Sequence, residues 1–330
     1  MGLEAGETKT GGGCRVAVVG VVGRTNAGKS TLVNQLVGEK VSIVSPVEQT
    51  TRNTVRGIVA DPRGQLVLLD TPGLHKAVGT LGTLLNRMAR RSAAGTDITC
   101  VVFDAAQEPQ LEDIGWMQRV ARERPEKVVF VLNKADRAPF FESMFKAAWE
   151  EAVTAVPPAH DGDRQRSAAV GDSRAASPLW VKCIATTEGG AKAVKDALFS
   201  LAEEGERLFD DDVVTDYPRK LAIADTIREK YLAKMHQEVP HEMGILVRRI
   251  VESPGRWEVS VEVLVNRASQ KPIVIGRGAM TVKYVRQCAE RELSDVFGVK
   301  VVLDIWVRVS PNWMRNNRLL AEMGYMGNLM

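Results

Sequence analysis

The 330-residue chain is poor in the features that mark secreted, zinc-binding and membrane-spanning proteins. No apolar run reaches the length of a membrane span, and the first thirteen residues lack the apolar core of a signal peptide. The few cysteines lie far apart and form no C-x-x-C pair, which argues against zinc and against a disulfide framework: Cys14, Cys100, Cys183 and Cys288. We therefore expect a soluble, intracellular protein with reduced thiols and a flexible leader over residues 1–14.

Length and charge predict two domains of different character. A chain of 330 residues is long enough to bury a core in each of two domains. The net charge of +3 divides unevenly: residues 217–330 carry 18 Lys and Arg against 12 Asp and Glu, whereas residues 1–216 carry 26 against 29. A basic C-terminal part suits a polyanionic partner, although solvated helix faces would give the same balance.

The first strong motif is the run G-R-T-N-A-G-K-S at residues 23–30, which has the G-x-x-x-x-G-K-S pattern of a phosphate loop. It follows a β-branched apolar run, residues 15–22, and precedes residues 30–37, which have helical spacing. Backbone N–H groups at such a helix N-terminus surround phosphate oxygens. Lys29 is predicted to reach the outer phosphates and Ser30 to bind Mg²⁺. Taken alone, this motif also allows an ordinary glycine-rich loop.

A second motif, D-T-P-G at residues 70–73, follows the apolar run 65–69. Asp70 at a strand end can hold a magnesium-bound water, and the Gly73 N–H can sense the γ-phosphate.

A third motif, N-K-A-D at residues 133–136, follows the apolar run 128–132. The two carboxylate oxygens of Asp136 match the paired N–H donors of guanine, and adenine presents no such pair. Three motifs, each after a predicted strand, predict a site for GTP or GDP with Mg²⁺. Its predicted members are Gly23, Arg24, Thr25, Asn26, Ala27, Gly28, Lys29, Ser30, Thr31, Asp70, Thr71, Pro72, Gly73, Asn133, Lys134 and Asp136.

The pattern of the first 205 residues predicts an α/β domain with a mostly parallel sheet, because strand-like runs alternate with helical stretches. The runs are 15–22, 55–60, 65–70, 98–104, 128–133 and 180–184. Residues 157–178 have almost no large apolar side chains and are predicted to form a surface insert, with a contact to RNA or a partner as the alternative. A helix near 190–204 closes the domain, which spans 15–205, and residues 206–216 form a linker.

Residues 217–330 predict a smaller α+β domain with the element order of a type II KH domain. The predicted elements are a helix at 220–234, strands at 244–251 and 257–265 joined as a hairpin across 253–255, a glycine turn at 273–279, a helix at 280–297 and a strand at 300–309.

The glycine turn has the place of the G-x-x-G loop with which KH domains hold the backbone of single-stranded nucleic acid. Gly276 and Gly278 are present, whereas the fourth position is Ala279. Arg277 and Lys283 would contact phosphates. An ordinary strand-to-helix turn is the alternative for this segment alone.

Together these residues resemble the Era family of ribosome-assembly GTPases over residues 15–330, apart from the insert. The resemblance is carried by the phosphate loop, Q-T-T-R-N at 49–53, L-L-D-T-P-G-L-H at 68–75, N-K-A-D, I-R-E-K at 227–230, V-P-H-E at 239–242 and the basic tail. It implies a GTPase with a KH domain that binds the 3′ end of small-subunit (16S-type) ribosomal RNA and assists assembly of that subunit.

The resemblance also implies roles for single residues. Thr51 would close on Mg²⁺ in the GTP state, with Thr50 as the alternative, so that Lys29, Thr51 and Gly73 form the catalytic set. Residues 184–186 stand where the family has Ser-Ala, so Ala185 and Thr186 would line the guanine.

Two further positions bear on hydrolysis. Leu74 stands where many GTPases have a water-orienting Gln, which implies slow intrinsic turnover. Asn26 would help to hold K⁺, or would only make the loop rigid.

A second function class stays open, in which the C-terminal domain docks on a membrane surface or a protein partner. Acidic residues within the helix predicted at 280–297 argue against a membrane-surface helix: Glu290, Glu292 and Asp295. We expect a monomer that does not bind DNA and is cytoplasmic. A peripheral place at the inner face of the cell membrane and an organellar location both remain open.

Overall fold

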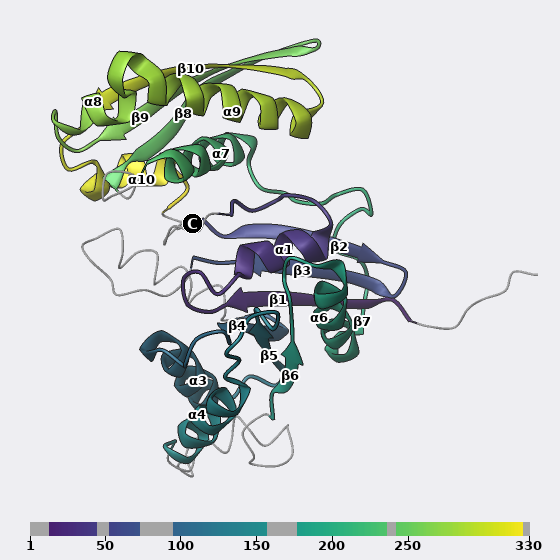
Figure 1. The fold of residues 1–330 in the computed structure, drawn as a ribbon. Coiled ribbons are helices and arrows are strands. Elements are labelled where there is room, and N and C mark those ends of the chain that lie inside the picture. Colours follow the sequence, from purple (N-terminus) through teal and green to yellow (C-terminus); the bar gives the residue numbers. More distant parts are fainter. Residues whose placement is uncertain (1–12, 45–52, 73–94, 157–176, 236–241, 326–330) are drawn as a thin grey trace, which may run out of the picture.

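The computed structural model describes residues 13–44, 53–72, 95–156, 177–235 and 242–325. Figure 1 shows two bodies, an α/β domain with helices on both faces of its sheet and a smaller α+β domain above it. Four predicted residues of the nucleotide site and its surroundings lie outside the described residues: Thr50, Thr51, Gly73 and Leu74. Most of the predicted insert lies outside them as well.

The sheet of the first domain is mostly parallel, as predicted, in the order β2-β3-β1-β4-β5-β6. β2 is antiparallel to β3, and the short β7 pairs antiparallel with β1. The elements are β1 Arg15–Val22, α1 Lys29–Val37, β2 Val55–Asp61, β3 Gly64–Asp70, β4 Ile98–Asp104, α3 Leu111–Glu123, β5 Val128–Asn133, α4 Glu142–Thr154, β6 Leu179–Lys182, α6 Glu188–Leu201 and β7 Glu203–Glu204.

Two apolar cores hold this sheet between layers of helices. α1 and α6 pack on one face, where Val19 and Leu198 are fully buried, and α3 and α4 pack on the other, around Phe103 and Phe130. Because both faces are covered, the central strands consist mostly of apolar residues, and β4 is buried along its whole length.

Two predicted boundaries in this domain are wrong. The helix predicted at 190–204 ends at Leu201, since Ala202 adopts an extended conformation. Glu203 and Glu204 instead pair with Val16 and Arg15 at the start of β1, and Lys127 forms an ion pair with Glu203. The strand predicted at 180–184 spans Leu179–Lys182.

The second domain has the predicted KH order, with the strand order β10-β9-β8. β9 is the central strand: β10 runs parallel to β9, and β8 runs antiparallel to β9. The elements are α7 Arg219–Lys234, β8 Gly244–Ser253, β9 Arg256–Val265, α8 Gln270–Ile275, a 3₁₀ turn Arg277–Ala279, α9 Met280–Phe297, β10 Lys300–Val309, a 3₁₀ turn Trp313–Arg315 and α10 Asn317–Glu322. Within the described ranges, every helix is too short or too polar to cross a bilayer.

Two helices of this domain were not predicted. α8 contains the β-branched run 273–275, which sequence patterning does not distinguish from a strand, and its Pro272 is tolerated because it lies in the first helical turn. α10 belongs to a C-terminal segment that packs on the sheet face opposite α7 and α9. There Trp313 and Leu320 cover Leu264.

The predicted linker, residues 206–216, follows the edge of the first sheet. The Ile58 N–H donates to the Val214 carbonyl at 2.9 Å, and Thr215 Oγ1 donates to the Arg56 carbonyl at 2.6 Å. The Gln65 side chain donates to the Phe209 carbonyl at 2.8 Å. These contacts fix the path of the chain toward α7.

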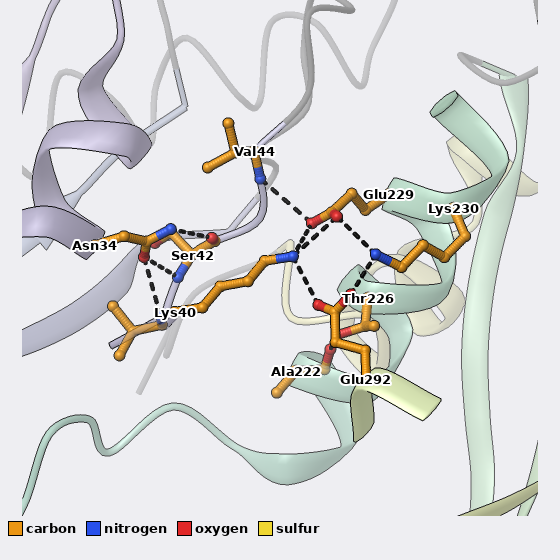
Figure 2. A network of polar contacts seen from close by, with 10 residues as sticks. Asn34, Lys40, Ser42, Val44, Ala222, Thr226, Glu229, Lys230 and Glu292 are labelled. Carbon is orange, nitrogen blue, oxygen red and sulfur yellow. Dashed lines mark hydrogen bonds and ion pairs between the residues drawn. The ribbon is translucent and has the colours of Figure 1, made fainter. Parts of the chain in front are cut away.

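The two domains also touch through residues on either side of the undescribed segment 45–52. Lys40 Nζ lies 2.8 Å from Glu229 of α7 and 2.6 Å from Glu292 of α9, and Figure 2 shows this network. On the far side of the segment, Asn53 Nδ2 donates to the Met323 carbonyl at 3.2 Å.

Candidate functional site

The phosphate loop connects β1 to α1, as predicted, and its glycines occupy positions that no other residue fits. Gly23 has φ +144°, and a Cβ there would lie 2.3 Å from the Val102 carbonyl oxygen. Gly28 has φ +99°, and a Cβ there would lie 2.2 Å from Asn133 Nδ2. The loop thus takes its shape against neighbouring strands, with α1 beginning at Lys29.

Lys29 is buried at the base of the loop, with its side chain only 6% exposed. Its ammonium donates to the Arg24 carbonyl at 2.7 Å. Burial lowers the pKa of Lys29 to about 8, and the nearby carboxylates of Asp70 and Asp113 work against this effect. A phosphate group bound here would stabilise the charged form and raise this pKa.

Asp70 ends β3 and is fully buried beside the loop. Burial raises the pKa of Asp70, whereas the Ser30 hydroxyl and the Lys29 charge oppose that rise. Neither of its buried carboxylate oxygens has a hydrogen-bond partner of normal geometry in the described part of the chain. Two buried carboxylate oxygens beside the Ser30 hydroxyl suit a hard divalent cation. The residues present therefore fit Mg²⁺.

Thr71, which follows Asp70, is hydrogen-bonded to β1, the strand that leads into the phosphate loop. Its Oγ1 donates to the Val21 carbonyl at 2.9 Å, and both Thr71 and Pro72 are buried. This bond holds the start of the D-T-P-G motif beside the loop.

The Asn133 side chain connects two segments of the predicted site. Its Nδ2 donates to the Ala27 carbonyl at 2.8 Å, and its Oδ1 accepts from the Ala185 N–H at 3.0 Å. Asn133 therefore joins the phosphate loop to the segment predicted to line guanine. Ala185 is buried, and the neighbouring Thr186 is exposed.

Lys134 and Asp136 lie in the turn that follows β5. Lys134 has φ +63°, and its ammonium donates to the Asn26 carbonyl at 3.0 Å and to Asp104 at 2.6 Å. The Asp136 side chain is exposed, so its carboxylate is accessible to an incoming base.

A cluster around Arg24 was not foreseen as a unit. The guanidinium lies 3.3 Å from Asp104 and 3.0 Å from the buried Asp113, and it donates to Gln107 at 3.0 Å. Burial raises the pKa of Asp113 to about 6, and Arg24 opposes that rise. The sequence offered one signal: Asp104 ends an apolar strand, as Asp70 does.

The described members of the predicted nucleotide site therefore gather around the ends of β1, β3 and β5. Thr25 and Thr31 are partly buried on the loop and the first turn of α1. The predicted residues Thr51 and Gly73 lie outside the described residues.

The second candidate site, the glycine loop, lies between α8 and α9. Gly276, Gly278 and Ala279 have φ values of +77°, +57° and +61°. A Cβ at Gly276 would lie 2.3 Å from Thr281 Oγ1. Arg277 and Lys283 are exposed, and neither makes an ion pair with another described residue. The loop thus presents backbone and cationic groups to solvent.

Two family models match the chain. One described as "50S ribosome-binding GTPase" matches residues 18–134, and one described as "KH domain" matches residues 238–314.

Curated relatives align over nearly the whole chain. The GTPase Era of Rippkaea orientalis is 32% identical over 315 residues, which cover 95% of this chain and 93% of the relative. The GTPase Era of a Geobacter species is 33% identical over 312 residues, covering 94% and 98%.

Solved structures agree with these sequence relatives. Era in complex with MgGDPNP and nucleotides 1506–1542 of 16S ribosomal RNA has a TM-score of 0.80 and 29% identity, covering 94% of this chain and 99% of that one. A variant of Aquifex aeolicus Era bound to GDP and AlF₄⁻ has a TM-score of 0.78 and 28% identity, with the same coverage. The chain therefore belongs to the Era family of GTPases.

Proposed function

We propose that this chain is a GTP-hydrolysing switch that binds small-subunit ribosomal RNA and assists assembly of that subunit. One observation carries the proposal: the phosphate loop, the buried Asp70 carboxylate and the N-K-A-D turn meet at the carboxyl ends of the parallel strands, in a chain that also bears an exposed KH loop. The complex of an Era protein with a 16S ribosomal RNA fragment supports the RNA part.

For the nucleotide, Lys29 holds the outer phosphates and Asp136 reads guanine. Mg²⁺ would be held by Ser30, Asp70 and, in the GTP state, Thr51, and it would neutralise charge on the transferring phosphoryl group. Thr50 is the alternative to Thr51. Because Leu74 cannot orient water, we expect slow intrinsic hydrolysis.

Potassium is a further part of the proposal. Asn26 lies exposed in the phosphate loop at φ +60°, and its backbone carbonyl accepts from Lys134. A side chain in this place could help to hold K⁺ against the phosphates. The alternative is that Asn26 only makes the loop rigid.

For the RNA, the loop at residues 276–279 holds the sugar-phosphate backbone, with Arg277 and Lys283 on phosphates. We propose a monomer that acts in the cytoplasm. Peripheral membrane contact through the second domain is the competing hypothesis.

The deciding experiment is crosslinking of the full-length chain in cells, followed by sequencing of the bound RNA. Enrichment of the 3′ end of small-subunit ribosomal RNA is expected. Binding of the purified chain to anionic vesicles, without RNA enrichment, would replace the RNA part of the proposal. Hydrolysis measured in potassium and in sodium tests Asn26, and an equal rate in both salts would remove its role in holding a cation.

A further inference from the structure

The outer face of the C-terminal sheet carries an exposed tryptophan on its edge strand. Along β10 the residues alternate, so that Ile305 and Val307 pack toward the helical core, whereas Trp306 points to the opposite face. Trp306 is 66% exposed. Its indole N–H donates to Asp304 at 2.7 Å, and this bond fixes the orientation of the ring. The ring therefore presents an ordered aromatic surface to solvent.

A basic groove lies beside this ring. It has a volume of about 450 Å³, and its polar lining consists of Arg248, Arg308, Ser310, Asn316, Arg318 and Glu322. Glu262, which is paired with Trp306 across β9 and β10, lies 2.8 Å from Arg248 and 3.2 Å from Arg308. The tryptophan and the groove are therefore neighbours on one face.

The arginines of the groove outnumber their acidic partners. Glu322 lies 2.8 Å from Arg248 and 3.2 Å from Arg318, so two carboxylates face three guanidinium groups. The Arg318 side chain is 89% exposed, so its ion pair with Glu322 contributes little to stability. Arg318 can therefore readily exchange the Glu322 carboxylate for another anion. Guanidinium groups match phosphate oxygens in a two-bond geometry. The guanidinium groups of the groove therefore suit a phosphate backbone, whereas Asp304, which accepts from the indole, adds a carboxylate beside Trp306.

We propose that this face, defined by Trp306 and the groove, binds a second stretch of single-stranded RNA. One base stacks on Trp306, while Arg308 and Arg318 hold the adjoining phosphates. Aromatic rings beside arginines are the means by which proteins bind unpaired bases. The inference rests on the proposed RNA-binding function and adds a surface to it, because a KH loop alone holds about four nucleotides.

The test uses the full-length chain and unstructured RNAs of about four and about twelve nucleotides, with binding followed by fluorescence anisotropy. Trp306→Ala should weaken binding of the longer RNA about tenfold and leave the shorter RNA unaffected. Trp306→Phe, which keeps a stacking surface, should recover most of the affinity. Arg318→Ala should lower the salt slope for the longer RNA by about one unit.

Arg256→Ala is the matched control, since Arg256 is exposed at the opposite end of β9 and pairs with Glu258. It should change neither affinity. Equal weakening of both RNAs by Trp306→Ala would mean that the ring supports the fold, and the inference would fail.

Two outcomes separate this inference from the function on which it rests. If the wild type binds both RNAs, and Trp306→Ala and Arg318→Ala bind them equally well, only the second surface is disproved. If the wild type binds neither RNA, the proposed RNA-binding function fails and the second surface fails with it.

Discussion

The ammonium nitrogen of Lys40 lies 2.8 Å from a carboxylate oxygen of Glu229, across the boundary between the two domains. Glu292 accepts from the same ammonium at 2.6 Å, and Lys230 pairs with both carboxylates (Figure 2). The Val44 N–H donates to Glu229 at 3.4 Å. The chain that leads toward the predicted switch residue Thr51 is thus joined to two helices of the KH domain.

Lys40→Ala should lower the free energy of unfolding by about 1 kcal/mol, because Glu229 is largely buried and would keep, among the described residues, only Lys230 as a cationic partner. Denaturant unfolding measures this change. Burial works to raise the pKa of Glu292, but bonds from Lys230 and Lys40 outweigh it and lower that pKa. The loss of stability caused by Lys40→Ala should therefore be full above pH 4.5, the ordinary pKa of a glutamate, and should disappear as the pH falls below it.

Lys146→Ala is the control for this prediction, since Lys146 forms an exposed pair with Glu142 at 2.8 Å within a single helix. Lys146→Ala should lower the free energy of unfolding by at most about 0.5 kcal/mol. Equal costs for the two variants would show that the contact between domains contributes no more than a surface pair.

Asp136→Asn should weaken GTP binding and shift preference toward xanthosine triphosphate. The amide places a donor where guanine also presents a donor, and xanthine has an acceptor at that position. Titration of both nucleotides into wild type and variant measures the change. Asp136 is exposed in a turn, so the fold should be unaffected. Unchanged GTP affinity would remove Asp136 from base recognition.

Nucleotide affinity should decline as pH rises above about 8, the pKa to which burial lowers Lys29. Bound phosphates favour the ammonium form, so that the bound pKa is higher than the free one. Affinity is then full below the free pKa and is lost by up to about tenfold per pH unit above it. Lys29→Ala should bind weakly, with no such decline over about pH 7 to 9. A parallel decline in that variant would assign the titration to another group.

The sequence was sufficient to predict the succession of strands along the chain and the phosphate loop, because each motif follows an apolar run that is typical of a buried strand. The β-branched apolar run at 15–22 likewise predicted β1, and the helical spacing of residues 30–37 predicted α1 to within one residue of its start. These features are local, and both the pattern and its physical reason lie within a few residues.

Features that depend on distant partners could not be predicted in this way. The hydrogen bonds that join the Asn133 amide to Ala27 and Ala185 are one example, since both partners are far away in sequence. The pairing of Arg24 with Asp113 needs α3 to lie against the loop. Trp313 was not singled out at all, since nothing in its neighbourhood predicts that it is buried against Leu264.

Arg277→Glu should weaken binding to single-stranded RNA of any sequence about equally and lower the salt slope by about one unit or more. Arg277 is exposed in the 3₁₀ turn and lies on the KH domain, so GTP hydrolysis by the intact chain should stay nearly unchanged. Anisotropy at several salt concentrations measures the slope. Loss of affinity for only one RNA sequence would indicate contact with a base instead of a phosphate.

Ala279→Gly should stabilise the KH loop by roughly 0.5–1 kcal/mol. Ala279 has φ +61°, where an L-residue pays a steric cost of about 1–2 kcal/mol, and glycine removes that cost but loses some entropy on folding. Gly276→Ala is the opposite test, because its Cβ would lie 2.3 Å from Thr281 Oγ1 at φ +77° and should destabilise the loop. Denaturant midpoints of the two variants give the comparison. If neither substitution changes stability, the left-handed backbone would be contradicted, and with it the geometry by which this turn is proposed to hold RNA.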